Sequence, residues 1–352
     1  MTKKILITGA CAVTARSVAR ALKRDFKNRI WICGVGIFEN EYSAHEEIYD
    51  LVIKTSHCTS KAYPNQIYSI LSNYKFDGVL VIPEIEVLVW AKEKFPAPYH
   101  LPTPQFIKKV SDKKELNLAL RNTKLAIKSI FFDSNNMEMR LSDWREFPCW
   151  VRPCDFGISS GRGAAKFETI KQIKDWVSLY PRHISWQVSE YVKGRNVAIS
   201  LLFRDSQLLN YGMYERLRYF GEHLFQSGVS GNISKGKIFT DTKLLADVLT
   251  ALDEFSDFRE GKVNGFLTLD LLLAENDLTK ITEINVRPTA PVEAYSLVGN
   301  HIIRNWVESI SGDTITESDR KFDKDKIILR DIDGKLLVVQ ENANKFAEIY
   351  NE

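Results

Sequence analysis

Two apolar, strand-like runs in the C-terminal third carry a group of oxygen-bearing side chains. They lie in "LTLDLLLAENDLTKITEINVRP", residues 267–288, and the polar "ENDL" separates them. Because side chains along a strand alternate with a period of two, Asp270 on the first run can face Glu283 and Asn285 on the second. Three hard oxygen ligands of this kind suit Mg²⁺, which takes its remaining oxygens from water and phosphates.

A solvated sheet face is the alternative interpretation of these residues. Both runs are otherwise apolar, and an unpaired carboxylate on a buried strand is costly, which favours a metal site. Arg287 follows Asn285 by two residues. It adds a fixed positive charge suited to a phosphate.

A glycine-rich loop follows a strand-like run near the middle of the chain, in "VRPCDFGISSGRGAAKF", residues 151–167. The strand carries Arg152, and the backbone N–H groups of the loop can wrap an anionic phosphate. The loop residues with this capacity are Gly157, Ser159, Ser160, Gly161 and Gly163. A plain hairpin is the alternative for this stretch.

A basic pair lies in "YERLRYFGEHLFQSGVSGN", residues 214–232. Arg216 and Arg218 are two residues apart, so on a strand they would share one face and could bind a substrate carboxylate. The alternative is a solvent-facing basic pair.

The first hundred residues predict a sheet that would precede these sites. Strand-like and helix-like runs alternate there, which favours a parallel sheet with covering helices. The opening "ILITGACAVTARSVARAL" has only Gly9 of the three glycines in a dinucleotide fingerprint, since Cys11 and Thr14 take the other two places. We therefore expect scaffold here rather than a nicotinamide or flavin site.

Further elements follow the proline-rich "FPAPYHLPTP", which predicts a rigid connector and the first domain boundary. A helix should begin at "SDKKEL", capped by Ser111 or Asp112. Strand-like runs with longer polar connectors return from about residue 147 and indicate α+β lobes. Among them, "WQVSEYVKGRNVAISLLF" reads as two strands around a short turn, and so by itself as a hairpin. The end of the chain predicts a second hairpin at Asp333 and Gly334 and a final helix in "NANKFAEIY".

Composition limits the class of protein. The chain has 352 residues, 44% hydrophobic and 26% charged, with a net charge of +3, which predicts two or three lobes of a globular enzyme. There is no basic arm, so no nucleic-acid partner is expected. The longest apolar stretches are strand-sized and no leader is evident, which predicts a cytoplasmic protein without a membrane span. The five cysteines have no zinc spacing and should be reduced thiols.

In this order, the three stretches 151–167, 186–203 and 267–288 resemble the ATP-grasp superfamily, particularly its carbamoyl-phosphate-synthetase-like and amino-acid-ligase branches. The resemblance spans roughly the first three hundred residues and implies three lobes, with an α/β pre-ATP-grasp domain followed by α+β ATP-grasp lobes. The implied parts are residues 1–102 for the first domain, 103–190 for the N-terminal ATP-grasp part with the lid, 191–310 for the C-terminal part with the metal site, and 311–352 for an extension. Two roles stay open for the extension, closing the C-terminal lobe or forming a homodimer contact.

The resemblance also implies roles for single residues. In "SDKKEL", Lys113 would reach the ATP phosphates, with Lys114 as the fallback, and Arg152 and Arg287 would act with it in phosphoryl transfer. The matching lid residues are Ser159, Ser160, Gly161, Arg162 and Gly163. The hinge residues Glu190, Tyr191 and Val192 would bind adenine, and the metal ligands would be Asp270, Glu283 and Asn285. Asn196 stands where the family usually has a ribose-binding carboxylate, a departure that puts the ribose contacts in doubt.

The implied activity is that of an ATP-dependent ligase. ATP and one or two Mg²⁺ ions, with Mn²⁺ as a substitute, would activate a small carboxylate as an acyl phosphate, and an amine would then form an amide or peptide bond. One alternative is activation of bicarbonate or another small acid, as in one half of a carbamoyl-phosphate synthetase. Another is a regulatory subunit that binds ATP without catalysis.

Overall fold

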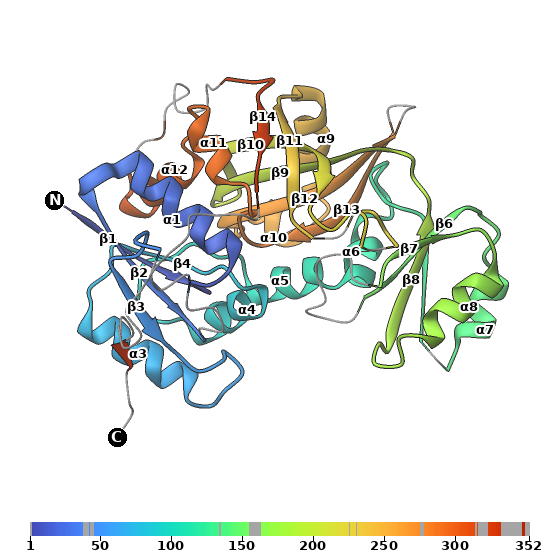
Figure 1. The fold of residues 1–352 in the computed structure, drawn as a ribbon, viewed down its shortest axis with the longest axis horizontal. Helices are drawn as coiled ribbons and strands as arrows, with labels where there is room; N and C mark the ends of the chain where they lie inside the picture. The colour runs from blue at the N-terminus through green and yellow to red at the C-terminus, as the bar shows by residue number, and fades with distance from the viewer. Residues whose placement is uncertain are drawn as a thin grey trace.

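Three β-sheets organise the chain (Figure 1). The computed structural model describes residues 2–37, 42, 46–133, 135–154, 163–224, 226–229, 231–274, 278–313, 315, 323–331 and 347–348. No helix within these ranges is both long and apolar enough to span a bilayer. The five cysteines are free thiols in the structure.

The N-terminal sheet has the strand order β15-β3-β2-β1-β4, and every pair in it is parallel. This confirms the parallel sheet predicted from the alternating runs. Its strands are β1 (Lys3–Thr8), β2 (Ile30–Gly36), β3 (Leu51–Lys54), β4 (Gly78–Leu80) and β15 (Ala347–Glu348). Its helices are α1 (Val13–Phe26), α3 (Tyr63–Asn73) and α4 (Glu84–Glu93), with the short 3-10 turn η1 (Lys27–Arg29) after α1.

The turn after β1 needs its glycine. Gly9 has φ of 63°, and a Cβ there would lie 2.5 Å from Cγ of Pro83. Positive φ and this close approach both require a residue without a side chain. Gly9 therefore serves the turn into α1.

The end of the chain differs from the prediction. A helix was expected in 342–350, but residues 347–348 form β15, which pairs in parallel with Ile53 and Lys54 of β3. An open edge of a parallel sheet offers unpaired backbone groups, and these two residues satisfy part of that edge. The predicted hairpin at Asp333 and Gly334 lies outside the described residues, while the apolar run before it forms β14 (Ile327–Leu329).

The central six-stranded sheet is antiparallel, in the order β13-β12-β9-β10-β11-β14. The other strands are β9 (Gly194–Arg204), β10 (Gln207–Tyr219), β11 (Ile233–Phe239), β12 (Gly265–Ala274) and β13 (Thr279–Asn285). Alternate residues of β9 belong to different cores. Val197 and Ile199 pack in one with α9 (Thr242–Leu252), whereas Ala198 and Leu202 pack in the other with α12 (Ile302–Ser311). Burial on both faces explains why these runs are almost continuously apolar.

A smaller four-stranded sheet lies at one end of the molecule, with α7 and α8 beside it (Figure 1). The strand order is β5-β8-β6-β7, and all its pairs are antiparallel. Its elements are β5 (Ser129–Asp133), α7 (Met137–Ser142), β6 (Cys149–Pro153), β7 (Ala165–Phe167), α8 (Ile170–Ser178) and β8 (Ser185–Glu190). Its core contains the buried rings of Phe132, Trp144 and Trp186.

The segment between β8 and β9 is not a hairpin. The two strands belong to different sheets, so residues 191–193 form a connection between the small sheet and the central one. The helices α5 (Pro104–Ser111) and α6 (Lys113–Leu120) run between the N-terminal sheet and the small sheet in Figure 1. This arrangement places the end of β6, the connection and the strands β12 and β13 around one space.

Two further short helices complete the described elements. α10 (Ser256–Arg259) follows α9, and α11 (Glu293–Leu297) precedes α12. Glu293 on α11 forms ion pairs with Arg20 (2.6 Å) and Arg24 (3.0 Å) of α1. The helices that follow the central sheet are thereby joined to the N-terminal domain.

Candidate functional site

A pocket of about 470 Å³ lies between the small sheet and the central sheet, with Thr14 of α1 in its lining. Its volume is within the usual range for small-molecule sites. Most of the residues that the sequence singled out line it: Lys113, Arg152, Glu190, Tyr191, Val192, Asn196, Arg216, Asp270, Glu283, Asn285 and Arg287. The fold thus brings together side chains from α6, β6, the β8–β9 connection and four strands of the central sheet.

The acidic residues face each other across β12 and β13. Asp270 pairs directly with Glu283, and Thr268 pairs with Asn285, with a register shift just after Asp270. This confirms the predicted juxtaposition on adjacent strands. The side chain of Asn285 is buried, and its Oδ1 has no hydrogen-bond partner among the described residues.

Basic groups surround Glu283. Burial disfavours its charged form, but Lys113, Arg152 and Arg287 outweigh this and lower the pKa of Glu283 below its ordinary value. A nearby positive charge favours the ionised carboxylate. Glu283 is therefore a permanent anion at neutral pH.

Arg152 is held between two sheets. Its Nε donates to Oε1 of Gln187 (2.7 Å) and its Nη2 donates to the carbonyl oxygen of Thr282 (2.8 Å). Burial lowers the pKa of Arg152, against the attraction of Glu283. Because arginine still remains protonated in proteins, the guanidinium is a fixed charge pointing at the strand that carries Glu283.

Lys113 is the first residue of α6 because the residue before it, Asp112, is the N-cap of the helix. Oδ1 of Asp112 accepts hydrogen bonds from the backbone N–H of Lys114 (2.8 Å) and Glu115 (3.0 Å), so Asp112 rather than Ser111 is the N-cap. Such a cap fixes where the helix begins. Lys113 lines the pocket, whereas Lys114 is exposed and does not.

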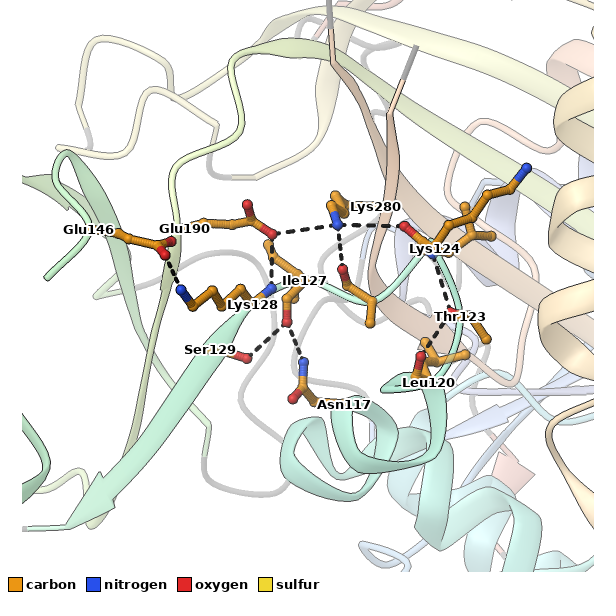
Figure 2. Close-up of polar contacts among 12 residues, drawn as sticks. Asn117, Leu120, Thr123, Lys124, Ile127, Lys128, Ser129, Glu146, Glu190 and Lys280 are labelled. Carbon is orange, nitrogen blue, oxygen red and sulfur yellow. Dashed lines mark hydrogen bonds and ion pairs between the residues drawn. The ribbon is translucent and has the colours of Figure 1, made fainter. Parts of the chain in front are cut away.

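The connection after β8 forms another wall. Oε1 of Glu190 accepts a hydrogen bond from the backbone N–H of Lys128 (2.9 Å) and lies 3.6 Å from Nζ of Lys280 on β13 (Figure 2). The aromatic rings of Trp150 and Tyr191 are 6.5 Å apart between centroids. With Ile127 and Leu272 they give the pocket apolar surface, which suits a flat ring of a ligand.

Arg216 and Arg218 do not share a face. Nη2 of Arg216 lies 2.5 Å from Oδ1 of Asp270, and its Nη1 donates to Oδ1 of Asn196 (2.9 Å). Register shifts in β10 separate Arg216 from Arg218, and Arg218 is exposed and outside the pocket lining. A β-bulge breaks strict alternation, so the expectation that the two arginines act as a pair is wrong.

Part of the glycine-rich loop, residues 155–162, lies outside the described residues, and with it Gly157, Ser159, Ser160, Gly161 and Arg162. Gly163 has φ of 73°, and its carbonyl oxygen accepts a hydrogen bond from Nε1 of Trp176 (2.9 Å). Its neighbour Ala164 lines the pocket. The strands on either side, β6 and β7, pair antiparallel.

Several pocket residues were missed by the sequence analysis. Thr14 on α1 and the turn Thr289–Pro291 line the side nearest the N-terminal sheet. Thr289 is buried, and its Oγ1 has no hydrogen-bond partner among the described residues. The proline-flanked "RPTAP" next to Arg287 was the available signal, whereas the apolar walls Ile127, Trp150 and Leu272 look like ordinary core residues in sequence.

The donor set fits a divalent cation that prefers oxygen. Glu283 is ionised and Asn285 offers an unpartnered buried carbonyl oxygen, with Asp270 beside them. No group of three or more His, Cys, Asp or Glu side chains arranged for a metal occurs within the described ranges. Carboxylate and amide oxygens without thiolate or imidazole suit Mg²⁺.

Comparisons with known proteins support a specific fold. No protein-family model and no curated protein matches the sequence. The structure is similar to N5-carboxyaminoimidazole synthetase from Staphylococcus aureus complexed with ADP, at 14% identity and a TM-score of 0.68, covering 94% of this chain and 81% of that one. It is also similar to L-amino acid ligase from Bacillus licheniformis, at 12% identity and a TM-score of 0.69, covering 92% and 79%.

A third similar structure is VanG D-Ala:D-Ser ligase from Enterococcus faecalis, at 15% identity and a TM-score of 0.59, covering 89% of this chain and 99% of that one. At such low identity the similarity shows the fold. These neighbours are ATP-grasp enzymes, the superfamily that the sequence motifs resemble. The chain therefore has the ATP-grasp fold.

Proposed function

We propose that the chain is an ATP-dependent carboxylate–amine ligase that works through an acyl phosphate. One observation carries the proposal: three cations, Lys113, Arg152 and Arg287, surround the ionised Glu283 in a pocket that is also lined by the apolar side chains of Ile127, Trp150 and Leu272. A triphosphate with a divalent ion fits the charged side chains, and a nucleobase fits the apolar ones. Two of the similar structures are named as ligases, and another was solved with ADP.

The chain's residues then have distinct tasks. Lys113, Arg152 and Arg287 would stabilise the charge on the phosphoryl group as a carboxylate oxygen of the substrate attacks the γ-phosphorus and ADP leaves. An amine nitrogen would next attack the acyl carbon, releasing phosphate and a proton and forming the amide. Neither step requires a nucleophilic cysteine or serine from the protein.

The metal and the nucleotide would use the residues already described. Glu283 and Asn285, with Asp270 beside them, would hold Mg²⁺, which supplies charge neutralisation at the phosphates. The apolar wall of Ile127, Trp150 and Leu272 and the segment Glu190–Val192 would enclose adenine. We assign residues 1–102 to a pre-ATP-grasp domain and residues 103–310 to the ATP-grasp lobes, with Ser159–Gly163 in the lid.

The acceptor substrates would bind on the side formed by Thr14, Arg287 and Thr289–Pro291. This assignment rests on the position of these residues at the end of the pocket that faces the N-terminal domain. The unpartnered Oγ1 of Thr289 offers a hydrogen bond there. Buried polar groups normally find a partner, which a bound substrate would provide.

The test is phosphate release from Mg-ATP across pools of amino acids and other small carboxylates, with and without amines. Glu283→Ala is the control. Release that needs both an acid and an amine and vanishes in the variant supports the ligase. Release with bicarbonate alone supports small-acid activation instead, and ATP binding without release in any pool supports a regulatory subunit.

A further inference from the structure

We propose that Arg216 takes the place of one divalent cation. The site then holds a single metal ion, bound by Glu283 and Asn285, and Asp270 is not a ligand. The inference rests on the proposed function for the identity of the nucleotide. It departs from the sequence-based expectation that all three side chains bind metal. Asp270 already forms a direct ion pair with the guanidinium of Arg216.

Arg216 is built into the sheet rather than lying loosely in the pocket. It stands opposite Asn196 on β9, while Asp270 lies on the far side of β9, opposite Ala198. The guanidinium spans β9, donating to Asn196 (2.9 Å) and reaching Asp270 (2.5 Å). Its side chain is 13% exposed and that of Asp270 is 22% exposed. A buried pair with this geometry is costly to separate because each charge would be left alone.

Aromatic packing supports the same position. The guanidinium carbon lies 5.6 Å from the ring centroid of Tyr214, within the range of a cation–π contact. Arg216 thus has three partners, from β9, β10 and β12. A metal ion on Asp270 would have to displace a cation that these partners hold.

Asn285 and Glu283, the two proposed metal ligands, differ from Asp270 in their contacts. Oδ1 of Asn285 has no hydrogen-bond partner among the described residues, and Glu283 stands two residues before it on the same strand. Across the pocket lining, five basic side chains face three carboxylates: Lys113, Arg152, Lys193, Arg216 and Arg287 against Glu190, Asp270 and Glu283. A triphosphate with one divalent ion still carries the negative charge that this excess attracts, whereas a second ion would reduce that charge.

The experiment counts bound Mn²⁺ by electron paramagnetic resonance, with a non-hydrolysable ATP analogue and without nucleotide. The native protein should bind one Mn²⁺ with the analogue. Arg216→Gln should bind two, and without nucleotide its affinity for Mn²⁺ should rise about tenfold because Asp270 becomes free. Asp270→Asn in the native background should still bind one ion.

Two control variants keep the test specific. Arg195→Gln removes another arginine–carboxylate pair between β9 and β10, with Glu215 (2.8 Å), outside the pocket lining, and should still bind one Mn²⁺. Arg216→Lys keeps the charge and should also bind one. If circular dichroism shows that Arg216→Gln is unfolded, Asp270→Asn decides, since loss of the bound ion in that variant overturns the single-ion site.

The outcomes separate this inference from the proposed function. Two ions in the native protein, or loss of the ion in Asp270→Asn, would overturn the single-ion site. Failure to bind the nucleotide analogue would overturn the ATP-dependent function. In that event the Mn²⁺ affinities measured without nucleotide still decide the inference, since a gain in Arg216→Gln supports it and equal affinities oppose it.

Discussion

The ammonium group of Lys280 lies 3.6 Å from the Glu190 carboxylate, joining the strand that carries Glu283 to the start of the β8–β9 connection. The same nitrogen donates to the backbone carbonyl of Ala126 (2.7 Å), and Glu190 also accepts from the N–H of Lys128 (2.9 Å) (Figure 2). These contacts join β13, the segment before β5 and the end of β8. These contacts tie the strand that carries Glu283 to the segment that carries Glu190.

Removing the ammonium group of Lys280 should loosen the contact between β13 and the end of β8. We expect Lys280→Met to raise the KM for ATP about tenfold and to change kcat less, because the variant leaves the charges around Glu283 in place but leaves Glu190 without its cation. Steady-state kinetics with varied ATP check this. Lys262→Met is a matched control, since Lys262 pairs with Glu260 on an exposed surface outside the pocket lining. An equal effect of the two substitutions would contradict the role of Lys280.

Glu86 should make stability depend on pH. Its carboxyl group is buried beneath α4 and contacts the Tyr63 hydroxyl. Burial raises the pKa of Glu86 from 4.5 to about 7, although the hydroxyls of Tyr63 and Thr8 act in the opposite direction. The folded protein therefore keeps the proton to a higher pH than the unfolded chain. Stability should fall as the pH rises from 4.5 to about 7 and change little from this group above that.

Urea unfolding at several pH values between 5 and 8 measures the effect. The native protein should lose up to about 3 kcal/mol across the full titration of this group. Glu86→Gln should remove most of that loss because its amide stays neutral and can still accept a hydrogen bond from Tyr63. Glu93→Gln, an exposed position on the same helix, should leave the pH dependence unchanged. Parallel curves for native and Glu86→Gln protein would show that Glu86 does not titrate in this range.

Gly194 should tolerate no side chain. It begins β9 beside the inter-sheet connection, and a Cβ there would lie 2.0 Å from the carbonyl oxygen of Leu273. We expect Gly194→Ala to cost about 3 kcal/mol of unfolding free energy, since two hydrogen-bonded strands would have to separate. Chemical denaturation measures this cost.

Gly228 provides the comparison for Gly194. A Cβ at Gly228 would meet nothing within 4 Å, and its φ is 64°. Gly228→Ala should therefore cost only the backbone strain, about 1 kcal/mol. Similar costs at the two positions would show that the approach of Leu273 to Gly194 relaxes easily.

Local sequence patterns determined much of the secondary structure of this protein. Alternating runs in the first hundred residues predicted the parallel sheet, because buried parallel strands must be apolar and need helical crossovers. The facing of Asp270 and Glu283 was also predictable, since a short connector joins their strands and strand periodicity then sets which side chains meet. For Lys113, Arg152 and the segment Glu190–Val192, the proposed roles came from the order of motifs that resemble one superfamily.

Tertiary structure decided the contacts that strand periodicity cannot predict. The turn after Glu190 looks like a hairpin in sequence, yet β8 and β9 join different sheets. The bulge in β10 sends Arg218 to solvent while Arg216 stays in the pocket, and residues 347–348 add to the edge of the N-terminal sheet. Arg216 meets Asp270 only because β9 lies between their strands. Such contacts depend on strand order and register across distant segments, which local spacing does not encode, so only the assembled sheets fix which charges neutralise one another.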